Sequence, residues 1–204
     1  IDLPGRDLGV NLPTWTGDGR RLVLTRSFPN GTQTMWIAAA DGSEAKEFLK
    51  AETSSSGQAF SPDGKSLAYS ARIGGIQQLY RLDLASGRSR QITASPGDKF
   101  NPTWSPDGGR IAYSSNATGV MEIWAVSPDG QAEKQMTSGF ERMYHPFYSP
   151  DGRRLYVQPS HRNVYRMPAG GGPLEPVTRF PESGLFLEEP TMSPDGRWLA
   201  YSRS

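Results

Sequence analysis

The chain has 204 residues, with 22 basic and 21 acidic side chains and a formal net charge of +1. Because the two signs are interspersed, the charge gives no basis for binding nucleic acid or an anionic membrane. The absence of cysteine excludes disulfides and thiol chemistry, and no stretch approaches the roughly 18 apolar residues of a membrane helix, so membrane insertion is not expected.

One tetrapeptide, Ser-Pro-Asp-Gly, recurs at a constant interval of 44 residues. The regularly spaced copies begin at Ser61, Ser105, Ser149 and Ser193, and a degenerate Thr16-Gly-Asp-Gly19 lies 45 residues before the first. A further copy at Ser127 falls only 22 residues after Ser105, so it marks a different turn within the same unit. A fixed period of this size indicates an array of similar units that share a continuous core, so we expect residues 1–204 to form a single domain.

Each unit is predicted to contain four short strands separated by turns. The first strand ends on an aromatic residue or Met, at Trp15, Phe60, Trp104, Tyr148 and Met192. Ser-Pro-Asp-Gly then supplies a type I turn, because proline presets φ and glycine accepts the conformation at its end. The second strand is apolar and includes Leu22–Leu24, Leu67–Tyr69, Ile111–Tyr113, Leu155–Val157 and Leu199–Tyr201.

The third and fourth strands follow a loop of variable sequence. The third carries a pair of bulky residues, namely Met35-Trp36, Leu79-Tyr80, Ile123-Trp124 and Val164-Tyr165. Such residues suit a half-buried sheet. The fourth is a polar outer strand, whose charges at Arg88, Arg90, Glu133 and Lys134 would discourage pairing with other molecules.

A four-stranded sheet with two apolar faces must stack on its neighbours, and stacking around an axis gives a β-propeller. A Greek-key sandwich is the all-β alternative, but it does not require a constant interval with the same turn at the same place. We therefore predict an all-β fold, a β-propeller of four-stranded antiparallel blades, with four complete blades and a partial fifth that ends after its second strand. Two alternatives remain open: a five-bladed ring that lacks one strand, or a piece of a larger ring of six to eight blades in a longer parent protein.

The best-preserved unit resembles the WD40-like repeat of TolB-type β-propellers. The resemblance rests on Asn101-Pro-Thr-Trp-Ser-Pro-Asp-Gly, Ile111-Ala-Tyr-Ser, Ile123-Trp, Asp129-Gly and Gln135-Met-Thr. It implies a bacterial propeller, often periplasmic or otherwise extracytoplasmic, that works as a binding platform. Similar repeats also form the propeller domain of prolyl-oligopeptidase-like serine peptidases.

Catalytic and cofactor signals are weak. Asp63, Asp107, Asp151 and Asp195 could be interpreted as a carboxylate ring for cations, but each stands where a type I turn favours aspartate. His145 and His161 are the two histidines, and the sequence lacks the Gly-x-Ser-x-Gly and His-Glu-x-x-His motifs. We expect no catalytic residue, no cofactor and no bound metal.

The position just before each first strand differs between units: Leu12, Gly57, Asn101, His145 and Glu189. Two interpretations remain open. Asn101, His145 and Glu189 could converge near the axis on a polar ligand or an ion, or they could simply cap solvated strand ends.

Strand parity places the tight turns on one face and the variable loops on the other. The variable-loop face is predicted to collect aromatic and Arg side chains, which dominate protein interfaces. They are Phe28, Arg72, Phe100, Phe140, Arg142, Tyr144, His161, Arg162, Phe180 and Phe186.

We expect a non-enzymatic scaffold that recognises a protein or peptide, and the alternative is the regulatory propeller of a serine peptidase. The predicted partner-binding residues are Phe100, Asn101, Arg142, Tyr144, His145, His161, Arg162 and Glu189. An incomplete ring would expose apolar blade faces, so self-association is also expected.

Overall fold

A computed structural model describes residues 9–29, 33–51, 57–73, 75–139, 142–160, 162–181 and 187–203. The described residues form antiparallel sheets that succeed one another along the chain, four with four strands and one with two. The predicted propeller of four complete blades and a partial fifth is confirmed, and every sheet keeps its strands in chain order. Within these ranges, no helix has the length and hydropathy needed to cross a membrane.

The strands have the following bounds. Blade 1 contains β1 (Gly9–Trp15), β2 (Arg21–Ser27), β3 (Gln33–Ala39) and β4 (Lys46–Ala51). Blade 2 contains β5 (Gln58–Phe60), β6 (Ser66–Ile73), β7 (Ile76–Asp83) and β8 (Ser89–Gln91). Blade 3 contains β9 (Lys99–Trp104), β10 (Ile111–Ser115), β11 (Glu122–Val126) and β12 (Lys134–Gln135). Blade 4 contains β13 (Met143–Tyr148), β14 (Arg154–Pro159), β15 (Tyr165–Pro168) and β16 (Glu175–Pro176), and blade 5 contains β17 (Leu187–Met192) and β18 (Leu199–Arg203).

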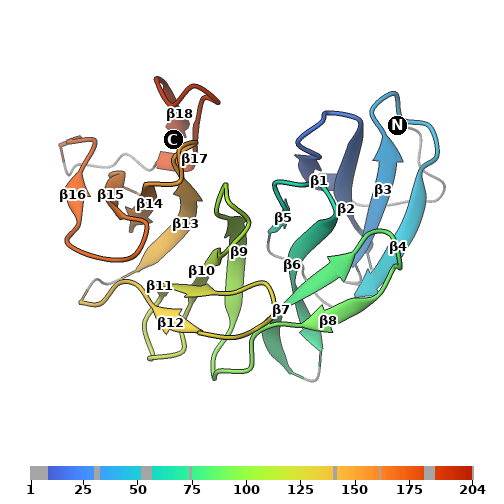
Figure 1. Cartoon of the computed structure of the whole chain (residues 1–204), viewed down its shortest axis with the longest axis horizontal. Helices are drawn as coiled ribbons and strands as arrows, with labels where there is room; N and C mark the ends of the chain where they lie inside the picture. The colour runs from blue at the N-terminus through green and yellow to red at the C-terminus, as the bar shows by residue number, and fades with distance from the viewer. Residues whose placement is uncertain are drawn as a thin grey trace.

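The blades are arranged as an arc around a common axis (Figure 1). The first strand of each blade, β1, β5, β9, β13 or β17, faces the centre of the arc, and β4, β8, β12 and β16 lie at its outside (Figure 1). Each first strand therefore contributes side chains to the axis, which is where a propeller can gather residues that are far apart in the sequence.

Apolar clusters join each blade to the next. One cluster combines Val23, Met35 and Ile37 of blade 1 with Phe60 and Leu67 of blade 2. Similar clusters join blades 2 and 3, blades 3 and 4, and blades 4 and 5. The core is thus a series of blade junctions, as the repeat predicts, since no blade buries both of its faces alone.

The Ser-Pro-Asp-Gly turns close as predicted and also pack against one another. In the blade 2 turn, Gly64 N–H donates to Ser61 O over 2.8 Å, and Ser61 Oγ donates to Asp63 Oδ1 over 2.6 Å. Between blades, the glycine of one turn lies over the proline of the turn before it: Gly152 is so close to Pro106 that a Cβ would stand 3.5 Å from its Cδ. The turn therefore contributes to the blade junctions as well as to its own hairpin.

A threonine after the short outer strand continues its pairing with the third strand. Thr93 Oγ1 accepts from Leu79 N–H at 2.9 Å in blade 2, and Thr137 Oγ1 accepts from Ile123 N–H at 2.9 Å in blade 3. Both threonines are buried. The side-chain oxygen satisfies a backbone donor that the truncated outer strand leaves without a ladder partner.

The prediction that Glu133 is a solvated edge charge is wrong. Glu133 Oε1 accepts hydrogen bonds from the Tyr113 hydroxyl and from Ser95 Oγ, the latter over 2.6 Å. Burial, followed by the contact with Glu133, raises the pKa of Tyr113. Glu133 thus ties the outer part of blade 3 to a buried tyrosine and to the loop that enters the blade.

Candidate functional site

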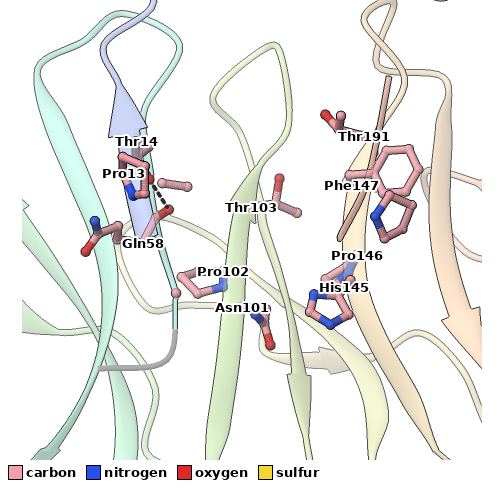
Figure 2. A pocket seen from close by; sticks show the side chains of 13 residues that line it. Pro13, Thr14, Gln58, Asn101, Pro102, Thr103, His145, Pro146, Phe147 and Thr191 are labelled. Carbon is pink, nitrogen blue, oxygen red and sulfur yellow. Dashed lines mark hydrogen bonds between the residues drawn. The ribbon is translucent and has the colours of Figure 1, made fainter. Parts of the chain in front are cut away.

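A cavity of about 610 Å³ lies at the axis of the arc. Figure 2 shows its wall, to which the first strands of all five blades contribute. Its lining residues are Pro13, Thr14, Gly57, Gln58, Ala59, Asn101, Pro102, Thr103, His145, Pro146, Phe147, Pro190 and Thr191. None of these thirteen residues is Asp, Glu, Lys or Arg, so the described part of the wall combines apolar surface with hydroxyl, amide and imidazole groups.

A β-bulge in the first strand places Asn101 and His145 on this wall. The pairing register shifts between Phe100 and Thr103 in blade 3 and between Tyr144 and Phe147 in blade 4. Asn101 has φ 50° and His145 has φ 48°, the left-handed region that non-glycine residues seldom occupy. Bulges of this kind redirect a side chain, and Figure 2 shows both residues at the same level of the wall.

The prediction that Asn101, His145 and Glu189 precede their strands is therefore wrong, because each lies inside a strand. The strands β9, β13 and β17 begin two residues earlier, at Lys99, Met143 and Leu187. A proline follows each of the three positions. Because proline has no N–H to donate to the ladder, such a residue pair is typical of the start of a strand, whereas here it lies in a bulge within the strand.

Blade 2 departs from the proline pattern at Gln58. Pro13, Pro102, Pro146 and Pro190 occupy this position in the other blades. The Gln58 side chain instead extends to blade 1, where its Oε1 accepts from Thr25 Oγ1 at 3.3 Å and its Nε2 donates to Val23 O at 3.4 Å. Gln58 is buried by these contacts and stabilises the junction between blades 1 and 2.

The structure separates the predicted partner-binding residues into two groups. Asn101 and His145 line the cavity, whereas Phe100, Arg142, Tyr144 and Arg162 do not. Tyr144 is half-buried and its ring centroid lies 6.3 Å from that of His145, so it stands beside the cavity wall. Arg142 and Arg162 are exposed, and Phe100 is half-buried in β9. His161 and the Glu189 side chain lie outside the described residues.

Several other residues predicted for the variable-loop face have structural contacts instead. Arg72 Nη2 pairs with Asp98 Oδ2 at 3.0 Å, and the guanidinium of buried Arg26 lies 5.3 Å from the centre of the Phe28 ring. Phe180 packs edge-on against Tyr201 with ring centroids 5.8 Å apart. Phe140 and Phe186 lie outside the described residues.

Sequence reasoning missed most of the residues that line the cavity, and it also missed two exposed residues of the variable loops. Thr103 and Phe147 line the cavity, and each lies two residues after the bulge position of its blade. This fixed offset within the repeat could have identified both residues. Ile76 and Val120 each follow a loop glycine, Gly75 or Gly119, at the same repeat position, and each is 46% exposed. That shared position could have identified them.

The aspartates of the tight turns carry out the structural role that was predicted for them. The hydrogen bond from Ser105 Oγ, followed by the one from Gly109 N–H, lowers the pKa of Asp107. The pKa values of Asp63, Asp151 and Asp195 are lowered in the same way by the serine of their own turn. In the part of the chain that the structure describes, no group of three His, Asp or Glu residues is placed to hold a metal ion.

Comparison with known proteins identifies the repeat. A family model described as TolB beta propeller domain matches residues 9–204. The Tol-Pal system protein TolB of Anaeromyxobacter dehalogenans (strain 2CP-C) is 29% identical over 92 residues, which cover 45% of this chain and 21% of that protein. The uncharacterized peptidase YuxL of Bacillus subtilis (strain 168) is 29% identical over 103 residues, 48% of this chain and 16% of that protein.

Among solved structures, TolB from Acinetobacter baumannii superposes with a TM-score of 0.78 at 23% identity. The superposition covers 97% of this chain and 49% of that one, so the chain spans about half the length of the solved TolB. The likeness at this identity concerns the fold. Together with the match of the family model over nearly the whole chain, it shows that this protein belongs to the TolB beta propeller domain family.

Proposed function

We propose that the chain is a non-enzymatic binding scaffold that recognises a protein or peptide partner at the mouth of the axial cavity. The observation that carries this proposal is the cavity of about 610 Å³, to which all five blades contribute and on whose wall Asn101 and His145 project from bulges of adjacent blades. Residues held in a rare backbone conformation beside a cavity are more typical of ligand sites than of plain scaffolding.

The chemistry of the cavity favours a peptide-like ligand. Thr14, Thr103 and Thr191 offer hydroxyl groups, Asn101 offers an amide, and Phe147 offers an aromatic face. A peptide backbone can donate hydrogen bonds to these hydroxyl and amide oxygens and accept hydrogen bonds from the hydroxyl and amide donors. Exposed Arg142 and half-buried Tyr144 stand outside the cavity, where they can contact the remainder of a protein partner.

The proposal is tested by identifying a partner and then measuring its affinity for single variants. Proteins captured on the full chain from native lysate are identified by mass spectrometry, and the strongest binder is purified for calorimetry. We expect Tyr144→Ala and Arg142→Ala to weaken binding by more than about 1 kcal/mol each, as truncation of an interface anchor does. Normal binding by both variants, together with loss of binding on substitution of the Ser-Pro-Asp-Gly turns, would place the site on the opposite face.

The second candidate is the regulatory propeller of a prolyl-oligopeptidase-like serine peptidase. The observation in its favour is the sequence similarity to the uncharacterized peptidase YuxL, which is 29% identical over 48% of the chain, against 45% for the aligned segment of Anaeromyxobacter TolB at the same identity. Sequencing of the parent gene discriminates the two candidates: an adjoining α/β-hydrolase sequence with a nucleophile elbow supports the peptidase, and a Tol-type gene neighbourhood supports the scaffold.

The proposed location is extracytoplasmic, in the periplasm, by resemblance to TolB. Fractionation of cells that express the full parent gene tests it, with a cytoplasmic enzyme as the marker of leakage. Recovery of the protein with the cytoplasmic marker would contradict this location.

A further inference from the structure

The tight turns of successive blades pack through one repeated contact, in which the glycine of a turn lies against the proline ring of the turn before it. At three junctions, a Cβ built on this glycine would lie within 4 Å of the proline Cδ. The pairs are Gly108 with Pro62 at 3.9 Å, Gly152 with Pro106 at 3.5 Å, and Gly196 with Pro150 at 3.6 Å. A proline ring therefore fills the same place at each of these junctions.

The junction of blades 1 and 2 lacks this ring. The degenerate turn of blade 1 has Gly17 where the other turns have proline, and a Cβ built on Gly64 of the next turn would have no atom within 4 Å. The blade 1 turn keeps the same closure, since Gly19 N–H donates to Thr16 O at 2.9 Å. The space beside Gly64 is open because a side chain is missing, while the turn itself has the ordinary shape.

A cavity of about 470 Å³ lies at this junction. We call it the turn socket, and it is lined by residues 16–18 and 20–21 of blade 1 and by residues 62–65 and 83–85 of blade 2. Ligand pockets have volumes of roughly 300–1,000 Å³, so the socket has the size of one. Half-buried Leu84 gives its wall an apolar side chain that packs against the cluster joining the two blades.

The charged groups of the socket differ in how they are bonded. Each carboxylate accepts on one oxygen from a hydroxyl and a backbone N–H of its own turn. The hydroxyl bonds are Thr16 Oγ1 to Asp18 at 2.6 Å, Ser61 Oγ to Asp63 at 2.6 Å, and Ser86 Oγ to Asp83 at 2.7 Å. Three exposed cations have no hydrogen bond or ion pair of their side chains among the described residues, namely Arg20, Arg21 and Lys65. The socket thus offers side-chain N–H donors that the fold does not use.

We propose that the turn socket docks a proline-rich segment of a protein partner, with one ring seated against Gly64 in the place that a turn proline fills at the other junctions. A segment in the polyproline II conformation has no internal backbone hydrogen bonds, so its carbonyls can accept from the guanidinium and ammonium groups of the socket. It is also ordered before it binds, which lowers the entropy cost. The inference goes beyond the proposed function, because the socket lies on the tight-turn face and not at the cavity mouth.

The test uses a synthetic decaproline peptide as the probe and the full chain labelled with ¹⁵N. Titration followed by amide chemical shifts should move the signals of Gly17, Gly64 and Leu84 and leave those of Asn101 and His145 in place. A peptide of five Gly-Ser repeats has the same length but no ring and no preference for polyproline II, so it should move none of them.

Gly17→Pro gives blade 1 the residue that the other turns carry, and so fills the socket from within. Gly17 does not have a positive φ, and its N–H donates no hydrogen bond within the described residues, so proline suits the position. The affinity for decaproline should fall at least about tenfold. The Tm should rise, because the unfolded chain loses freedom. Lost binding in a more stable protein cannot be attributed to damage to the fold.

Gly17→Ala is the milder variant, and it keeps the test valid if Gly17→Pro unfolds. A Cβ built on Gly17 would meet only Pro62 O, at 3.7 Å, so the fold accepts it, and a smaller loss of affinity is expected. Gly170→Ala is the matched control, because Gly170 lies on the outer turn of blade 4, also without a positive φ and with open space at its Cβ. It should bind decaproline as the wild type does.

The outcomes separate this inference from the proposed function. Shifts confined to the residues of the axial cavity, equal affinity of the wild type and both Gly17 variants, or no shift at all would overturn the socket. An equal response to the Gly-Ser peptide would overturn it as well, because the ring would not be what is recognised. Each of these results leaves the cavity-mouth proposal standing, whereas normal partner binding by Tyr144→Ala and Arg142→Ala contradicts the cavity mouth and leaves the socket standing.

Discussion

Gly57→Ala should destabilise the protein through the spacing between blades 2 and 3. Gly57 is the residue of blade 2 that corresponds to Asn101 in the repeat; it has φ +96°, and a Cβ built on it would lie 2.9 Å from Asn101 Cα and 3.2 Å from Asn101 N. These are backbone atoms of the neighbouring blade, so they can move away only if the junction itself opens. The substitution therefore tests whether close backbone contact at the axis sets the position of Asn101.

The magnitude has two parts. Placing alanine at a positive φ costs roughly 1–2 kcal/mol, and forcing extra volume against a packed backbone costs about 1–3 kcal/mol more. The free energy of unfolding should fall by about 2–5 kcal/mol in total. For a domain of this size, each kcal/mol corresponds to about 2–4 °C in Tm.

Gly64→Ala is the matched control, because Gly64 has φ +68° but no atom within 4 Å of a Cβ. It should cost only the backbone term of roughly 1–2 kcal/mol. Urea unfolding of the wild type and both variants, followed by tryptophan fluorescence, gives the two losses. Equal losses for Gly57→Ala and Gly64→Ala would refute the reasoning, since they would mean that the junction accommodates a methyl group freely.

Three further predictions concern the turns, pH and association. Pro106→Ala should lower the free energy of unfolding by about 0.5–1 kcal/mol, because the unfolded chain gains freedom, and should leave partner affinity unchanged; loss of binding at unchanged Tm would contradict a purely structural turn. The pKa values of the turn aspartates are lowered in the folded protein, whereas in the unfolded chain these carboxyl groups titrate at about 3.9. Below about pH 4 the unfolded state therefore binds more protons than the folded state, so the free energy of unfolding should decrease as the pH is lowered. Thermal melts of the wild type and Asp107→Asn between acid and neutral pH check this, and a Tm that rises on acidification would be inconsistent with it. Trp15 and Trp198 are 52% and 70% exposed, so Trp15→Ser with Trp198→Ser should reduce self-association in light scattering, and unchanged scattering would exclude these side chains as the contact.

The sequence by itself determined the architecture, because the repeat imposes the same local chemistry at every unit. Proline and glycine of Ser-Pro-Asp-Gly have narrow backbone requirements, so the turn and the two strands that it joins were fixed locally. Apolar residues on the second and third strands then require a neighbouring blade, and the constant interval requires that neighbour to be alike. The order and number of the described strands follow from these facts.

The bulge was decided only by the tertiary structure. Asn101-Pro102 and His145-Pro146 look like strand starts in the sequence, since the residue before a proline and the proline itself are both typical of strand edges. They lie inside strands because ladder pairing resumes on both sides of them, and that pairing involves residues of the second strand that are ten or more positions away. The local sequence pattern does not indicate which residues of the second strand will pair on either side of the proline, so it could not predict the bulge.

The division of polar and charged residues between structure and surface was likewise decided by tertiary contacts. Glu133, Arg72 and Lys99 are charged residues of types that usually lie exposed to solvent. In the structure each one is paired with groups from another strand or loop. Arg72 meets Asp98 only when blades 2 and 3 pack side by side. Glu133 meets Tyr113 when the strands of blade 3 pair, and Lys99 meets the carbonyls of residues 95–97 when the loop before its strand folds back. Ile76 and Val120, in contrast, stay exposed because the same packing leaves the loop tips uncovered, and the sequence could identify their shared position but not their exposure.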